Sequence, residues 1–213
     1  MKSSLIRPAL ALALVAGLAG CGGSDKAEFV VKGTIAGIVY PGAVLSTNGM
    51  EIAIAPPATP GDLVSFSFPN KLEYGDVYRV VFKSPPNNQQ CGTPQGQYDS
   101  SSDTAGRLAD INIAFVCEVT PYAIGGAVTG LTADGLVLSN GSTGGTVSIA
   151  KPAAGVTTPV PFTFDTPVRF GVSYGVTVLT QPTGQVCTVA NGTDVMKAAN
   201  VSNIAVTCVA APS

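Results

Sequence analysis

The side chains that most often perform catalysis are sparse in this chain, and histidine is absent from its 213 residues. Without histidine there can be no Ser-His-Asp or Cys-His arrangement, and no histidine-bound metal. The sequence also contains no Gly-Lys pair of a phosphate-binding loop. The commonest nucleophilic and phosphate-binding sites are therefore excluded.

One pair of residues has a catalytic spacing. Ser148 and Lys151 match Ser-x-x-Lys, the spacing of a nucleophile and its base. On a helix this spacing brings two side chains to one face, whereas on a strand an odd spacing sends them to opposite faces. The segment 146–149 alternates polar and apolar residues as a strand does. We therefore expect no catalytic pair here and no enzyme activity.

The acidic residues are dispersed, and several lie beside Gly or Thr in predicted turns, where Asp is favoured for backbone reasons. Such dispersal leaves a glycosidase pair open at the level of sequence. The richest cluster, residues 98–103, offers the carboxylates of Asp99 and Asp103 as calcium ligands. It lacks the ligand count and closing Glu of known calcium loops. We therefore predict a solvated loop, no bound metal and no cofactor.

The N-terminus has the pattern of an export signal. Lys2 and Arg7 precede residues 8–20, which are almost wholly Ala, Leu, Val and Gly. A membrane-spanning helix needs about 20 apolar residues, and the segment 22–26 ends the apolar run too early. We therefore expect residues 1–20 to be a signal helix that is removed from the mature protein.

The apolar run closes with Leu18, Ala19, Gly20 and Cys21, which resemble the lipobox of bacterial lipoprotein precursors. The resemblance implies that the Cys21 thiol receives a diacylglyceryl group and that signal peptidase II cuts before it. An ordinary signal peptide, cut elsewhere, is the alternative. Gly22 stands where Asp signals inner-membrane retention in that family, which implies the outer membrane of a Gram-negative bacterium.

The mature chain is weakly acidic. Of the 11 basic residues, loss of Lys2 and Arg7 leaves 9 against 13 acidic ones, a formal charge of −4. Nucleic acids and anionic membrane surfaces attract clustered Lys and Arg, so neither is an expected partner. We expect membrane contact through the lipid on Cys21, with residues 21–28 as the tether.

The remaining chain consists of two copies of one unit. Segments 32–38, 42–46, 66–68 and 75–80 match segments 125–131, 135–139, 162–164 and 171–176, and Gln89 and Cys91 match Gln185 and Cys187. The offset drifts only from 93 to 96 over this span, which indicates a tandem duplication. We predict repeats at 29–118 and 123–213, joined by a linker at 119–122.

Each repeat contains two cysteines once Cys21 is assigned to the lipid. We predict the disulfides Cys91–Cys117 and Cys187–Cys208, each closing a terminal hairpin. Export to an oxidising compartment permits them. Zinc ligation is the alternative, but zinc sites use closely spaced cysteines or added histidines.

Short alternating segments bounded by Gly, Pro and Asn predict strands throughout both repeats. Val147 and Ile149 share one face, as do Val176 with Val178 and Ile204 with Val206. Six or seven strands in about 90 residues is the scale of a Greek-key sandwich, and Gly-x-x-Tyr-x-Val is typical of a tyrosine corner. We therefore predict an all-β protein of two tandem antiparallel Greek-key (Ig-like) β-sandwich modules.

The order of these segments is similar to that of Ig-like, fibronectin-like and transthyretin-like secreted modules. The whole unit, ending in Gln-x-Cys and a second Cys, resembles tandem repeats of proteobacterial surface lipoproteins. The first copy departs from this pattern at residues 84–87 and in the long loop 95–107. The resemblance implies a fold and assigns no activity.

The function expected is that of a lipid-anchored envelope lipoprotein with structural, adhesive or protein-binding modules. Low charge and Thr-rich strands leave sheet edges available to another envelope or surface protein. The alternative is a small-ligand or carbohydrate binder that uses the loops around Tyr98 and Tyr122. Trp is absent, which weighs against an aromatic sugar platform.

Overall fold

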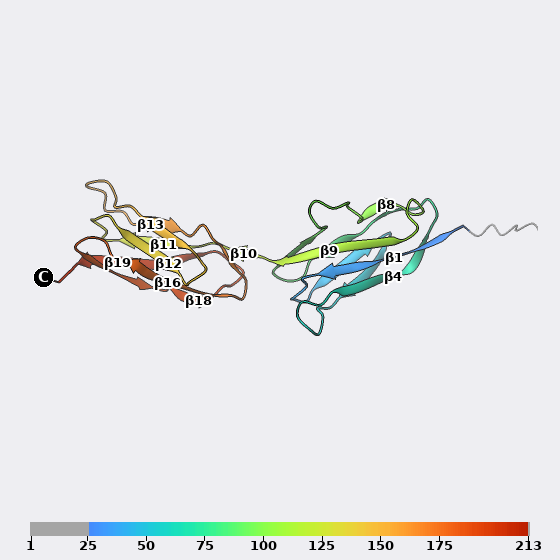
Figure 1. The fold of residues 1–213 in the computed structure, drawn as a ribbon, viewed down its shortest axis with the longest axis horizontal. Helices are drawn as coiled ribbons and strands as arrows, with labels where there is room; N and C mark the ends of the chain where they lie inside the picture. Colours follow the sequence, from blue (N-terminus) through green and yellow to red (C-terminus); the bar gives the residue numbers. More distant parts are fainter. Residues whose placement is uncertain (1–25, 213) are drawn as a thin grey trace, which may run out of the picture.

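The computed structural model describes residues 26–212. The predicted signal helix, the lipobox and Cys21 lie outside the described residues. Within them the chain is all-β, and two β-sandwiches lie end to end (Figure 1). The prediction of two β-sandwich modules is confirmed. Among these residues there is no helix of the length and apolar content that a membrane span requires.

The first module is built from nine strands. They are β1 (Glu28–Ala36), β2 (Ala43–Thr47), β3 (Met50–Ile54), β4 (Val64–Glu73), β5 (Val77–Arg79), β6 (Val81–Ser84), β7 (Gln89–Gly92), β8 (Ser102–Thr104) and β9 (Ile111–Val119). One sheet has the order β4-β1-β9-β7, the facing sheet has the order β3-β2-β6, and β5 pairs with β8.

The second module repeats this arrangement. Its strands are β10 (Pro121–Tyr122), β11 (Ile124–Thr129), β12 (Leu136–Asn140), β13 (Thr146–Ile149), β14 (Val160–Thr163), β15 (Val168–Arg169), β16 (Ser173–Thr180), β17 (Gln185–Ala190), β18 (Thr193–Val195) and β19 (Val201–Ala210). The two main sheets have the orders β14-β11-β19-β17 and β13-β12-β16-β18.

The first and last long strands of each module are parallel neighbours. β1 pairs with β9, and β11 pairs with β19, in the middle of a four-stranded sheet that is otherwise antiparallel. Gly33 and Gly126 lie on these pairs, where a Cβ atom would collide with the carbonyl oxygens of Ile113 and Ile204 respectively. In each module the two parallel strands can approach this closely only because the position on the first strand is glycine. In constant-type Ig domains the first strand instead shares a sheet with the second, fifth and fourth.

Each sandwich has its own core, made by the inward face of alternating strands. Ile35, Leu45 and Ile113 are fully buried in the first module, as are Leu138 and Val206 in the second. The predicted shared faces are present, because Ile149, Val176 and Ile204 are buried while their strand neighbours point outward. Full burial of each such side chain contributes roughly 1.5–3 kcal/mol.

The predicted tyrosine corner differs from what the structure contains. Tyr78 and Tyr174 are buried, as expected for core residues. However, the Tyr78 hydroxyl lies 3.5 Å from the carbonyl oxygen of Ser100, whereas a tyrosine corner bonds to backbone a few residues upstream. Ser100 belongs to the long loop 95–107, an insertion in the first copy, so Tyr78 instead connects the core to that inserted loop.

Candidate binding surface

A buried glutamine fixes the loop that follows the first strand of the first module. The Gln89 Oε1 atom accepts hydrogen bonds from the backbone N–H groups of Val39 (2.8 Å) and Tyr40 (2.9 Å). Its Nε2 atom donates to the carbonyl oxygen of Gly37 at 2.7 Å. The side chain is 3% exposed. Gln89 therefore provides hydrogen-bond partners for three backbone groups of the segment that leaves the sheet after β1.

The second module contains the same arrangement around Gln185. Its Oε1 atom accepts from Thr132 and Ala133, and its Nε2 atom donates to the carbonyl of Gly130 at 2.7 Å. Alignment of the two repeats matched Gln89 with Gln185 but did not reveal this role. The available signal was a polar residue at an inward strand position, which is a position where a buried amide needs partners.

Both predicted disulfides are present, and each joins directly opposed residues of adjacent strands. Cys91 on β7 faces Cys117 on β9, and Cys187 on β17 faces Cys208 on β19. The Cα atoms are 4.0 Å apart in each pair. Each bond therefore closes a terminal hairpin within one sheet.

The short Cα separation also defines which way the backbone points. Directly opposed residues at about 4.5 Å form the non-hydrogen-bonded type of antiparallel pair. The N–H and C=O groups of Cys91 and Cys187 therefore point away from the last strand. Because β7 and β17 are edge strands, these groups lie in the plane of the sheet and point away from its open edge.

At Cys187 a side-chain amide covers those groups. The Gln181 Oε1 atom accepts the Cys187 N–H at 2.7 Å, and the Gln181 Nε2 atom donates to the Cys187 carbonyl at 3.1 Å. The amide thus makes the two hydrogen bonds that a neighbouring strand would make. The edge of β17 is closed at this position.

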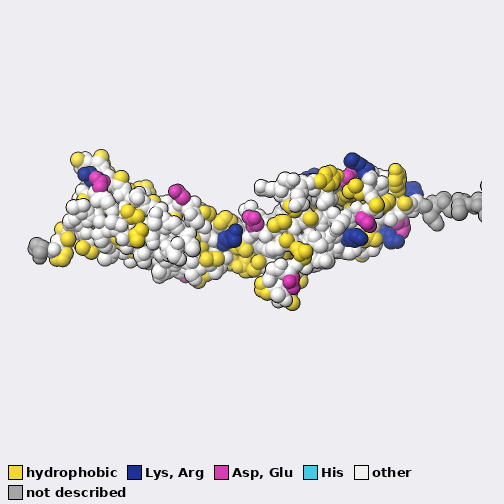
Figure 2. Space-filling model, viewed as in Figure 1, with side chains coloured by type: hydrophobic (Ala, Val, Ile, Leu, Met, Phe, Trp, Pro, Cys, Tyr) yellow, Lys and Arg dark blue, Asp and Glu magenta, His cyan; other side chains and the backbone are white. Residues whose placement is uncertain are grey.

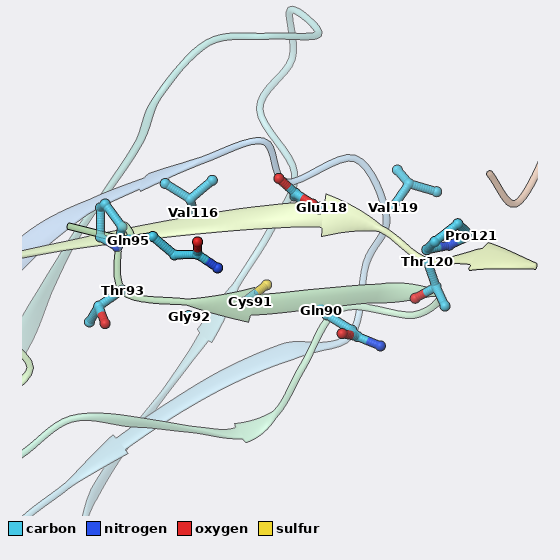
Figure 3. A pocket seen from close by; sticks show the side chains of 11 residues that line it. Gln90, Cys91, Gly92, Thr93, Gln95, Val116, Glu118, Val119, Thr120 and Pro121 are labelled. Carbon is cyan, nitrogen blue, oxygen red and sulfur yellow. The ribbon is translucent and has the colours of Figure 1, made fainter. Parts of the chain in front are cut away.

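A groove of about 560 Å³ lies along the β7–β9 hairpin of the first module (Figure 3). Its polar lining residues are Gln90, Thr93, Gln95, Glu118 and Thr120. In Figure 3 the side chain of Gln95 lies over the space between β7 and β9. Glu118 is the one charged residue among those that line the groove. The groove was not predicted, because strand alternation does not show how the residues after β7 fold back.

The groove ends at the joint between the modules. The linker predicted at residues 119–122 contains the end of β9, Thr120 and β10, and β10 pairs with β15. The Thr120 carbonyl accepts the Phe170 N–H at 3.0 Å. The ring of Tyr40, from the first module, packs edge-on against Phe170, with ring centroids 5.4 Å apart. Contacts from both modules therefore fix the joint.

The calcium candidates have protein donors on their carboxylates. Asp103 accepts the Tyr98 hydroxyl at 2.6 Å and the Arg107 guanidinium at 3.0 Å, and Asp99 accepts the Ser101 N–H at 2.9 Å. The Tyr98 hydrogen bond is the main cause that lowers the pKa of Asp103, and the same bond raises the pKa of Tyr98. Over residues 26–212 no three metal-ligating side chains gather into a cluster.

The other candidate residues are not brought together. Lys151 lies beyond the end of β13 and pairs with Asp134 at 3.4 Å, whereas Ser148 points outward from the strand. Tyr98 lies on the inserted loop of the first module, while Tyr122 packs against the core of the second. The two tyrosines proposed for ligand binding therefore belong to different modules.

Comparisons with known proteins return structural similarity alone. No family model matches the chain, and no curated protein matches it. A streptococcal ancillary pilin is 12% identical over 87% of this chain, with a TM-score of 0.24, and the match spans 63% of that pilin, less than two thirds. Two major pilins of Streptococcus pyogenes, T3.2 and T-13, are 11% and 10% identical over 87% of this chain. The matches span 97% and 96% of those pilins, and both have a TM-score of 0.22. Similarity at this level assigns no function.

Proposed function

We propose that this chain is a lipid-anchored envelope protein whose two sandwiches form a non-catalytic structural, adhesive or protein-binding rod. The observation that carries the proposal is the joint. β10 pairs with β15, Thr120 bonds to Phe170, and Tyr40 packs on Phe170. Flexible linkers lack such contacts. A fixed joint holds the second module at a set distance from the end where β1 begins (Figure 1).

We infer the anchor from the lipobox-like residues that end at Cys21. β1 begins at Glu28, so six residues lie between it and the cysteine, and the seven steps from Cys21 to Glu28 span roughly 25 Å at full extension. The first module would lie close to the bilayer and the second farther out. Each buried methylene of the acyl chains adds about 0.8 kcal/mol to membrane attachment, which makes a lipoprotein anchor long-lived.

The surface supports contact with proteins more than with polyanions. Six of the nine basic residues among the described ones belong to the first module, and three belong to the second. Figure 2 shows largely uncharged atoms over the second module. A neutral, Thr-rich surface suits contact with another protein, because only three of the described basic side chains belong to the second module, whereas phosphate and lipid headgroups attract clustered positive charge.

Two measurements test the proposal. Cys21→Ser should move the protein from the membrane fraction to the soluble fraction, and a Cys21→Ser protein that remains membrane-bound would contradict the lipid anchor. Cross-linking in intact envelopes, followed by purification of the wild-type protein, should return the same envelope or surface protein in each repeat. Recovery of no reproducible partner would contradict a protein-binding role.

A further inference from the structure

The edge of β7 differs from the edge of β17 in one respect. In both modules the N–H and C=O groups of the first hairpin cysteine point out of the sheet. At Cys187 the Gln181 amide binds both groups. Among residues 26–212 neither group of Cys91 has a hydrogen-bond partner, and Thr93, two residues on and just past the end of β7, has none for its backbone either.

The cause lies in one residue of an otherwise matched turn. Ser84 pairs with Val44 as Thr180 pairs with Val137, so the strands that enter the two turns end at equivalent places. The Gln89 and Gln185 N–H groups then bond to Pro86 and Pro182 at 3.2 Å in each turn.

The turn residue equivalent to Gln181 is Pro85, six residues before the hairpin cysteine in both cases. Proline has no side-chain donor or acceptor. The first module therefore lacks the amide that closes the edge in the second, and the Cys91 backbone is left open.

We propose that β7 accepts an extended segment of a partner protein by β-strand addition at Cys91 and Thr93. This inference rests on the proposed protein-binding role and names its site. Main-chain hydrogen bonds would give affinity, and the groove beside the edge would select side chains. A free strand edge that is uncovered by a side chain is the usual template for such pairing.

The groove indicates the chemistry of the segment. Apart from Glu118, its polar lining is Gln90, Thr93, Gln95 and Thr120, all uncharged. Glu118 lies on β9, two strand spacings from the incoming segment, roughly 10 Å. A lysine or arginine of the segment can cross β7 and reach it. We therefore expect a mostly neutral segment of Thr, Ser, Val or Gln type that carries one basic residue.

The short length of the edge argues against a second copy of this chain as the occupant. β7 has four residues and Pro94 follows soon after, so few ladder positions are free. A stable pairing of two whole modules buries about 1,600 Å², more than so short an edge provides. A single extended peptide needs only the few groups that are free.

The test uses the lipid-free mature chain, residues 22–213, and a displayed library of random seven-residue peptides. Peptides selected on this chain should bind Pro85→Gln at least about tenfold more weakly, because the new amide covers the Cys91 backbone as Gln181 covers Cys187. Pro85→Leu is the matched control. It removes the same proline without adding an amide and should bind as the wild type does.

Amide hydrogen exchange supplies a second measurement. In the free protein the Cys91 N–H should exchange faster than the Cys187 N–H, and bound peptide should protect Cys91. Gln181→Leu should make the Cys187 N–H exchange faster, which checks independently that the amide covers the edge should Pro85→Gln fail to fold; unchanged exchange would contradict that role.

The inference is overturned when no peptide is enriched, or when the selected peptides bind wild type and Pro85→Gln equally. An envelope partner that cross-links equally to both proteins would also overturn it, while leaving the protein-binding role intact. Loss of that partner with Pro85→Gln but not Pro85→Leu supports both.

Discussion

Gln89 and Gln185 show how a single buried amide can define a loop. Each bonds to three backbone groups of the segment after the first strand, and each is almost fully buried. A buried donor or acceptor left without a partner costs about 1–3 kcal/mol. The loop after β1 also carries Tyr40 to the joint. The amide therefore affects both stability and the contact between modules.

Gln89→Leu should lower the free energy of unfolding of the first module by about 3 kcal/mol, since the Val39 and Tyr40 N–H groups lose their acceptor. Urea denaturation followed by the fluorescence of tyrosine measures this. Gln90→Leu, at the exposed neighbouring position, is the control and should change stability by less than about 0.5 kcal/mol. Equal effects of the two substitutions would contradict the role of Gln89.

The Tyr98–Asp103 pair makes a prediction about pH. The pKa of Asp103 is lowered, chiefly by the Tyr98 hydroxyl. A carboxyl group of this kind stabilises the fold above its unfolded pKa, about 3.9, and this stabilisation is lost as pH falls through the folded pKa. In Tyr98→Phe the pKa of Asp103 should rise toward its ordinary value, as measured by NMR titration of its carboxyl carbon. An unchanged titration would show that the hydroxyl does not act on Asp103.

At the scale of elements, the architecture depends on which strands lie beside one another more than on the residue pattern of each strand. The alternation of Ile204, Val206 and Cys208 was sufficient to predict which face is buried, because side chains on a strand alternate. The same alternation carries no information on which strand lies beside it. The parallel pairing of β11 with β19 was therefore missed, and with it the reason for Gly126. The groove beside β7 was missed for the same reason, since it depends on how distant segments meet.

Gly33→Ala should destabilise the first module by more than about 2 kcal/mol, because the added methyl group meets the Ile113 carbonyl oxygen across the parallel pair and the ring of Phe66. Chemical denaturation measures the change. The control is Lys32→Ala, the exposed neighbour on the same strand, which should cost less than about 0.5 kcal/mol. A Gly33→Ala protein as stable as wild type would mean that β1 and β9 can separate at no cost.

At the scale of the whole molecule, the joint decides whether the protein behaves as one body. The contact is small and depends on one aromatic pair, one backbone hydrogen bond and the short β10–β15 ladder. An edge-to-face aromatic pair contributes about 0.5–1.5 kcal/mol beyond its buried area. Comparison of the two repeats could not predict this contact, because Tyr40 and Phe170 are far apart in the chain.

Phe170→Ala should broaden the range of angles between the modules without unfolding either one. Small-angle X-ray scattering would then give a shorter maximum dimension, averaged over bent forms. Val172→Ala, an exposed residue of the same loop region, should leave the scattering unchanged. A Phe170→Ala profile identical to that of the wild type would show that the aromatic pair does not hold the joint.

The parallel pairs also determine how the protein bears mechanical load. The chain enters each module at the start of its first long strand and leaves from the far end of its last, and these strands are adjacent and parallel. Tension applied between residues 28 and 210 would pull β1 against β9, and β11 against β19, in opposite directions along their length. The hydrogen bonds of each ladder would then be strained together in shear rather than opened one at a time from an end. Rupture under force is governed by the unfolding rate, and this geometry should keep that rate low when the two modules are pulled apart lengthwise.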